Sequence, residues 1–170
     1  MVKMDQHSFA ITGGNRDGNL RDVKKYNIVD NTTKTLRPLL EARSRHGCAM
    51  VEKNSKWLIV VTGGKSDQGI LQTTEVLVIC KLWSYWKEIG KLNVARNGHG
   101  MTVTEKGALV MGGVDENRNN LKSVELLDLE TLEWQKMEPS LAMARGRYGG
   151  GVEIPAGLFD CEIQPIVITG

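Results

Sequence analysis

A short apolar strand that ends in a pair of glycines recurs along this chain. The first glycine of each pair lies at position 13, 63, 112 or 170, so successive pairs are about 50 residues apart, with a longer last interval. A fixed period of this length is typical of proteins built from stacked supersecondary modules, each of which buries its apolar surface against its neighbours. The complete pairs are Gly13-Gly14, Gly63-Gly64 and Gly112-Gly113.

Other residues recur in the same phase as the glycines. An Ala-Arg pair places Arg43, Arg96 and Arg145 before a ring residue and a glycine, and the ring residues are His46, His99 and Tyr148. A second strand follows each glycine pair, at 23–27, 74–78 and 124–128, and Trp86 and Trp134 follow that strand in the second and third modules. The first module has Thr33 or Thr35 in place of the tryptophan. Four markers in register indicate a true repeat.

The combination of glycine pair, polar loop, Val-Glu-x-Leu-Asp strand, tryptophan and arginine resembles the kelch repeat. This resemblance implies an all-β fold of β-propeller blades, each a four-stranded antiparallel sheet arranged around a channel. We expect blades at about 1–40, 41–91 and 92–142 and a partial blade at 143–170. Because a propeller closes with about four to eight blades, we expect an incomplete ring. The remaining blades would come from additional sequence or from self-association, and the chain would begin without an Arg-plus-ring strand.

The phase also predicts the individual strands. In the second module they are expected at 46–51, 57–62, 74–79 and 84–88. In the third module they are expected at 99–104, 108–111, 123–129 and 133–136. The strands before the glycine pairs are continuous apolar runs, which suits a strand that is buried on both faces.

Charge and cysteine content narrow the function classes. The formal net charge is +2 with 25% charged residues, so the chain has no basic field that would favour nucleic acid. The apolar run 57–61 is far shorter than the ~20 residues of a membrane span, and we expect a cytoplasmic or nuclear protein. Cys48, Cys80 and Cys161 are scattered and form no zinc or redox motif, so no cofactor is expected.

Most repeated residues are interpreted as structural. The glycines relieve crowding at strand ends, and the tryptophans are expected to fill the wedge between neighbouring blades. Glu75 and Glu125 lie one module apart, too far for a shared acid–base site, so we expect each to pair with an arginine or with backbone donors. His46 and His99 share a register and are expected to pack or to donate hydrogen bonds rather than to bind a metal.

Positions that differ between repeats are the candidates for binding. The loops after the glycine pairs and the linkers between modules are expected to emerge on one face, at positions from which kelch adaptors present polar side chains to acidic peptides. Arginine's planar fork suits carboxylates, so the expected partner is a protein with an acidic segment. The candidate contact residues are Ser44, Arg45, Asn97, Arg147, Asn15, Arg16, Lys65, Ser66, Asp115 and Asn117. An insertion at 155–165 and a surplus tryptophan, either Trp83 or Trp86, are candidates for a second surface.

Two function classes remain open. The resemblance implies a protein-interaction adaptor or scaffold, for example in substrate recognition by a cullin-type ubiquitin ligase or in cytoskeletal (actin) binding. The alternative is an enzyme on the same fold, of the copper radical oxidase or sugar isomerase type. An oxidase needs converging tyrosine, cysteine and histidine ligands. Tyr26 and Tyr148 occupy repeat positions, and the histidines are not clustered in sequence. We therefore expect no enzymatic role.

Overall fold

The computed structural model describes residues 1–79, 84–146, 150–153 and 166–169. Within these ranges the chain forms β-strands and no helix. The strands are β1 (Val2–Lys3), β2 (Ser8–Thr12), β3 (Val23–Asn27), β4 (Thr32–Thr35), β5 (Gly47–Lys53), β6 (Lys56–Thr62), β7 (Thr74–Ile79), β8 (Ser84–Ile89), β9 (Gly100–Thr104), β10 (Gly107–Met111), β11 (Val124–Asp128), β12 (Trp134–Met137), β13 (Gly150–Glu153) and β14 (Ile166–Thr169).

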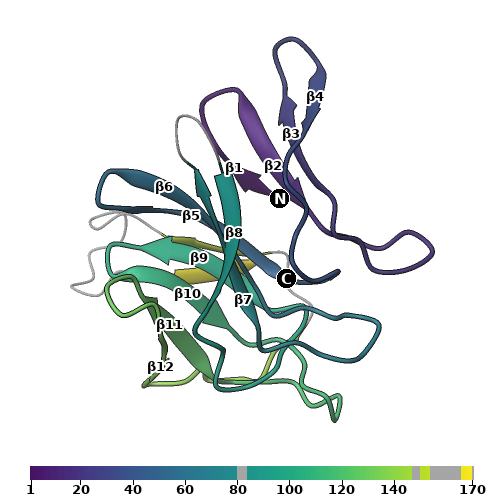
Figure 1. The fold of residues 1–170 in the computed structure, drawn as a ribbon. Helices are drawn as coiled ribbons and strands as arrows, with labels where there is room; N and C mark the ends of the chain where they lie inside the picture. Colours follow the sequence, from purple (N-terminus) through teal and green to yellow (C-terminus); the bar gives the residue numbers. More distant parts are fainter. Residues whose placement is uncertain (80–83, 147–149, 154–165, 170) are drawn as a thin grey trace.

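These strands form three four-stranded antiparallel sheets, β1–β4, β5–β8 and β9–β12, and one strand pair, β13–β14. Within each sheet the strands lie side by side in chain order. The first strands of neighbouring sheets contact one another: β1 contacts β5, β5 contacts β9, and β9 contacts β13. The inner edges of the sheets therefore lie together. Figure 1 shows the resulting open row of blade-like sheets, which do not close into a ring. The predicted all-β, blade-type fold is confirmed.

The predicted strands of the second and third modules agree with the structure to within three residues at each end. At the start of the chain, Val2–Lys3 forms a two-residue strand that pairs with Phe9 and Ala10 of β2. This strand carries no arginine and no ring, so the repeat markers could not reveal it.

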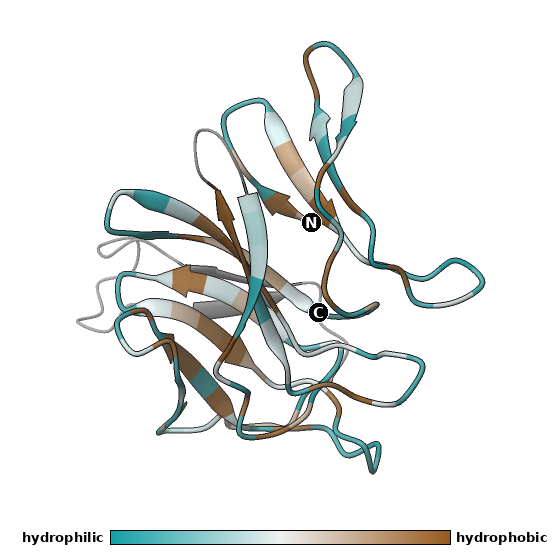
Figure 2. Ribbon diagram, viewed as in Figure 1, coloured by the Kyte–Doolittle hydropathy of each residue, from teal (hydrophilic) through white to brown (hydrophobic). Residues whose placement is uncertain are grey.

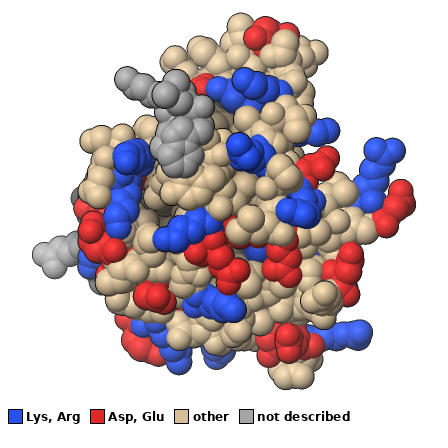
Figure 3. All heavy atoms as spheres, in the orientation of Figure 1, with Lys and Arg blue, Asp and Glu red and all other residues tan. Residues whose placement is uncertain are grey.

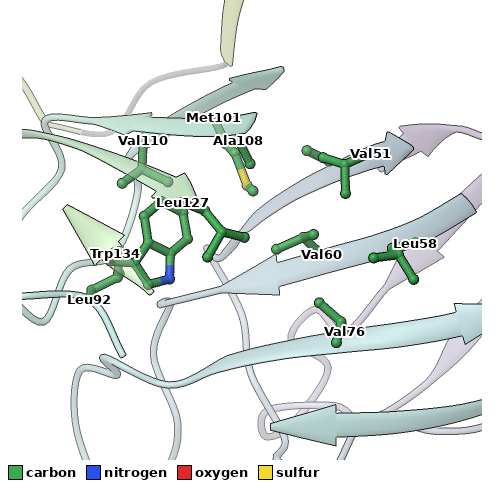
Figure 4. Packing of buried hydrophobic residues seen from close by; sticks show 11 residues of the cluster. Val51, Leu58, Val60, Val76, Leu92, Met101, Ala108, Val110, Leu127 and Trp134 are labelled. Atoms are coloured by element: carbon green, nitrogen blue, oxygen red, sulfur yellow. The ribbon is translucent and has the colours of Figure 1, made fainter. Parts of the chain in front are cut away.

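Apolar side chains fill the spaces between the sheets. Between the first and second sheets, Ala10 and Val23 pack against Ile59, Val61 and Leu77. Between the second and third sheets lies a larger cluster, which Figure 4 shows from close by. In Figure 2, brown hydrophobic residues lie along the strands of the second and third sheets, and many residues of the connecting loops are teal. Face-to-face packing of sheets is therefore the main source of apolar burial.

Each tryptophan of the repeat lies between two sheets, as predicted. Trp86 is 8% exposed, packs in the first interface and donates from Nε1 to the carbonyl oxygen of Arg37 at 2.8 Å. Trp134 is 6% exposed, packs in the second interface and donates from Nε1 to Thr74 Oγ1 at 2.9 Å. Thr33 takes the corresponding register position on β4, opposite Tyr26. Trp83 lies outside the described residues, so its predicted surface role is untested.

The part of the chain that the structure describes contains no helix long and apolar enough to span a membrane. On the face seen in Figure 3, blue basic and red acidic side chains are intermixed.

We predict that Trp134→Ala will lower the free energy of unfolding by about 3–5 kcal/mol, because it leaves a cavity between two sheets and removes the hydrogen bond from Trp134 Nε1 to Thr74 Oγ1. Urea unfolding followed by circular dichroism measures the loss. The matched control is Trp57→Ala, since Trp57 is 49% exposed and should change stability by less than about 1 kcal/mol. Equal losses for the two variants would contradict this role of Trp134.

Candidate functional site

The glycine pairs form the turns at which one sheet meets the linker to the next. Both residues of each pair have positive φ, for example 60° at Gly63 and 95° at Gly64, which favours glycine. The amide of Gly64 donates to the carbonyl oxygen of Arg96 at 2.8 Å, and an added Cβ at Gly63 would lie 2.6 Å from that oxygen. The same bond joins Gly14 to Arg43 and Gly113 to Arg145. The backbone of each repeated arginine is therefore tied to the preceding sheet.

The side chain of Arg43 is fully buried and fastens the linker to its own sheet. Nη1 donates to the carbonyl oxygens of Gly63 at 2.9 Å and Thr73 at 3.0 Å. Nη2 donates to Thr73 Oγ1 at 3.0 Å and to Glu75 Oε1 at 2.6 Å. Glu75 also accepts from the linker amides of Leu40 and Glu41 at 2.6 and 3.0 Å. This carboxylate joins the arginine, the strand β7 and the linker.

Arg96 repeats this network in the third sheet. Its guanidinium donates to the carbonyl oxygens of Gly112 and Ser123, to Ser123 Oγ and to the Glu125 carboxylate. Glu125 accepts from the linker amides of Asn93 and Val94. Burial lowers the pKa of the Arg96 guanidinium, and its ion pair with Glu125 opposes that shift. The prediction that Glu75 and Glu125 pair with arginine and backbone donors is confirmed.

Arg145 makes the same backbone bonds, to Gly113 and Leu121, but its side chain is exposed. Among the described residues it has no ion pair. The corresponding sheet is represented only by β13 and β14, so no described strand occupies the position of β7 or β11.

Of the two repeated histidines, His99 is buried and His46 is partly buried. His46 Nε2 lies 2.8 Å from Thr12 Oγ1, whereas the ring nitrogens of His99, which is 5% exposed, have no hydrogen-bond partner among the described residues. Desolvation by burial, reinforced by Arg43 for His46 and by Arg96 for His99, lowers both pKa values from 6.5 to about 3. Both rings are therefore neutral at pH 7. Within the described residues no group of three or more His, Cys, Asp or Glu side chains could hold a metal ion.

We use the term loop face for the surface formed by the loops 13–22, 63–73 and 112–123 together with the linker residues 42–46 and 95–99. Figure 1 shows the three loops on one side of the row of sheets, to the right of the view. Backbone bridges join linker to loop, Ser44 to Lys65 and Asn97 to Val114. The structure thus brings these candidate segments together.

Two adjoining cavities open on the loop face. One, of about 610 Å³, is lined by Gly14, Asn15, Asn19, Ser44, Arg45, Lys65, Ser66 and Asp67. The other, of about 560 Å³, is lined by Arg45, Lys65, Ile70, Asn97, Val114, Asp115, Glu116, Arg118, Asn120 and Gly146. Arg45 and Lys65 line both cavities, and both side chains are exposed.

The other candidates differ in their access to these cavities. Asn15 is exposed and lines the first cavity, and Asp115 lines the second. Ser44, Ser66 and Asn97 are 7%, 5% and 6% exposed, and their side chains already make hydrogen bonds within the chain.

Two further candidates, Arg16 and Asn117, line neither of these cavities. Arg16 is exposed. Asn117 lines a separate hollow beside Lys91 and Asn93. Arg147 and the 155–165 insertion lie outside the described residues.

One polar link on the loop face was not anticipated. Asn19 Nδ2 donates to Asp67 Oδ1 at 2.6 Å, and Asn19 Oδ1 accepts from Ser44 Oγ at 2.7 Å. Asn19 thereby joins the first loop, the second loop and the linker between them. The sequence showed only that Asn19 and Asp67 lie in turn-rich loops, and their separation of 48 residues gave no sign of contact.

Comparison with known proteins adds a family signal. Residues 95–140 match the model of the Kelch motif. The chain is 34% identical over 59 residues to acyl-CoA-binding domain-containing protein 5 of Arabidopsis thaliana, a match that covers 35% of the chain and 9% of that protein. It is 25% identical to acyl-CoA-binding domain-containing protein 4 of the same plant and to protein 6 of that name in Oryza sativa subsp. japonica. These two matches cover 78% of the chain and only 22% of each relative.

The buried histidines predict a loss of stability in acid. Because the unfolded chain binds these protons near pH 6.5 and the folded chain only near pH 3, stability is complete above pH 6.5 and falls as the pH drops towards 3. Each histidine should contribute a loss of about 2 kcal/mol between pH 7.5 and pH 5. Urea unfolding at both pH values should show a smaller pH dependence for His99→Phe than for the unmodified chain. An unchanged pH dependence would contradict the burial of His99.

Proposed function

We propose that this chain, which matches the Kelch motif at residues 95–140, acts as a protein-interaction module whose loop face binds an acidic segment of a partner. The family is consistent with protein binding in general, whereas the acidic partner and the contact residues are our proposal. This proposal rests mainly on the backbone conformation of Arg45 and on its position on the loop face.

Arg45 has a left-handed backbone, with φ of 54°. The corresponding residue in the next repeat is Gly98, with φ of 57°, and its amide donates to the carbonyl oxygen of Arg45 at 2.8 Å. A residue with a Cβ costs roughly 1–2 kcal/mol in this conformation, and glycine would avoid that cost. Backbone strain of this kind often accompanies a functional side chain, which supports recognition by Arg45.

The surroundings of Arg45 favour a carboxylate ligand. Its guanidinium has no ion pair among the residues that the structure describes, and Lys65 is a second exposed cation on both cavities. By contrast, the buried Arg43 uses both Nη1 and Nη2 for hydrogen bonds within its own sheet. We therefore assign recognition to Arg45 and Lys65, and structural support to Arg43 and Arg96.

We propose an adaptor role for this module. Substrate recognition in a cullin-type ubiquitin ligase and actin binding are the two settings that the repeat implies. Cosedimentation with filamentous actin distinguishes them, because an actin-binding module pellets with the filaments and a ligase adaptor stays in the supernatant.

We predict that Arg45→Gly will weaken binding of a short Asp/Glu-rich peptide by about 1–3 kcal/mol, because it removes a charge-assisted contact. The melting temperature should stay the same or rise, since the backbone strain is relieved. The measurements are a fluorescence anisotropy titration and a thermal melt. The control is Lys56→Ala, an exposed cation in the β5–β6 hairpin outside the loop face.

A peptide in which Asn and Gln replace Asp and Glu tests the charge requirement. The proposal fails if this peptide binds as tightly as the acidic one, or if Arg45→Gly and Lys56→Ala have equal effects.

A further inference from the structure

A second cavity lies away from the loop face, in the wedge between the first and second sheets. Its volume is about 380 Å³, at the small end of the range of ligand sites. The described lining comes from Met4, strands β3 and β4, Leu36 and strands β7 and β8: Met4, Lys25, Asn27, Thr32, Lys34, Leu36, Leu77, Ile79 and Ser84. None of these residues belongs to the loop face.

The equivalent space between the second and third sheets is filled. There Val76 lies opposite Val60 and Val78 opposite Leu58, and all four belong to the cluster of Figure 4 or pack against it. In the same register of the first sheet, Lys25 lies opposite Ala10 and Asn27 opposite Ser8. In the first wedge, two polar residues that line a cavity thus occupy the positions that two packed valines occupy in the second wedge.

Two lysines lie side by side on the first-sheet wall of this wedge. Lys25 on β3 lies directly opposite Lys34 on β4, an arrangement in which like charges repel. Lys25 is 35% exposed and pairs with Asp5, with 3.2 Å between Nζ and Oδ2. Lys34 is exposed and has no ion pair within the described ranges. Within the described residues, a carboxylate therefore pairs with only one of the two neighbouring lysines.

The floor beneath the lysines is apolar. Leu77 is 1% exposed, and Met4, Leu36 and Ile79 are partly buried against the cluster of the first interface. A ligand that matches both the lysine pair and the apolar floor of the cavity needs an anionic head to neutralise the lysines and a short apolar tail to cover the floor. Neither a simple anion nor a neutral apolar molecule meets both requirements.

We propose that this wedge binds a small anionic amphiphile, a carboxylate with an apolar tail, between Lys25 and Lys34. The carboxylate lies between the two ammonium groups and the tail lies on Leu36, Leu77 and Ile79. The site is independent of the loop face and of its acidic partner.

Isothermal titration of the whole chain with decanoate, below its micelle concentration, tests the proposal. We expect saturable binding at one site, weakened about tenfold in Lys34→Met and in Lys25→Met. Asp5→Asn should tighten binding, because Lys25 loses its competing carboxylate. Lys24→Met is the matched control, since Lys24 lies on the same strand with its side chain on the opposite face, and it should bind decanoate as the unmodified chain does.

Two further ligands separate the head from the tail. Acetate carries the charge without the tail, and decyltrimethylammonium carries the tail with the opposite charge, so neither should bind with comparable affinity. Arg45→Gly should leave decanoate binding unchanged, which distinguishes this site from the loop face. Thermal melts verify that each variant is folded.

The proposal is overturned if decanoate shows no saturable binding, or if folded Lys25→Met and Lys34→Met bind it as the unmodified chain does. Equal affinity for decyltrimethylammonium would also overturn it, because the lysine pair would then play no part.

Discussion

The buried ion pair between a linker arginine and a glutamate of the third strand is the interaction on which the rest of this structure depends. Arg43 and Arg96 are fully buried, and each joins the end of a glycine strand, the next strand and the linker. A buried charge is costly unless its hydrogen bonds are satisfied, and here both the guanidinium and the carboxylate have several partners. Because the arginine carbonyl accepts from the preceding glycine pair, this network also sets how one sheet follows another.

The loop face is built on this network. Arg45 follows Arg43 by two residues, so the buried side chain fixes the backbone from which the exposed side chain projects. The glycine pairs allow the close approach, and His46 and His99 pack beside Gly13 and Gly63. The repeated residues Arg43, Arg96, Trp86 and Trp134 are thus buried, whereas Arg45 and Lys65 stay exposed and line both cavities of the loop face.

The repeat predicted the sheets, but it did not predict most of the contacts between residues of separate strands and loops. Periodicity and apolar runs located the strands of the second and third modules, because each module must bury both faces. The repeat did not reveal β1, because Val2–Lys3 carries none of the repeated residues. The Asn19–Asp67 link and the Lys25–Lys34 wedge depend on which residues meet across separate strands and loops. Burial of Ser44 and Asn97 likewise depends on bridges to Lys65 and Val114, which no spacing rule specified.

A double-mutant cycle on Arg43 and Glu75 tests the central claim most directly. Urea unfolding would be measured for the unmodified chain, Arg43→Met, Glu75→Gln and the double variant. If the pair is a structural unit, each single change should cost about 3–5 kcal/mol, since it leaves a buried group without its partner, and the double variant should lose far less than the sum. Additive losses, with a coupling below about 0.5 kcal/mol, would show that Arg43 and Glu75 act separately and would contradict this account.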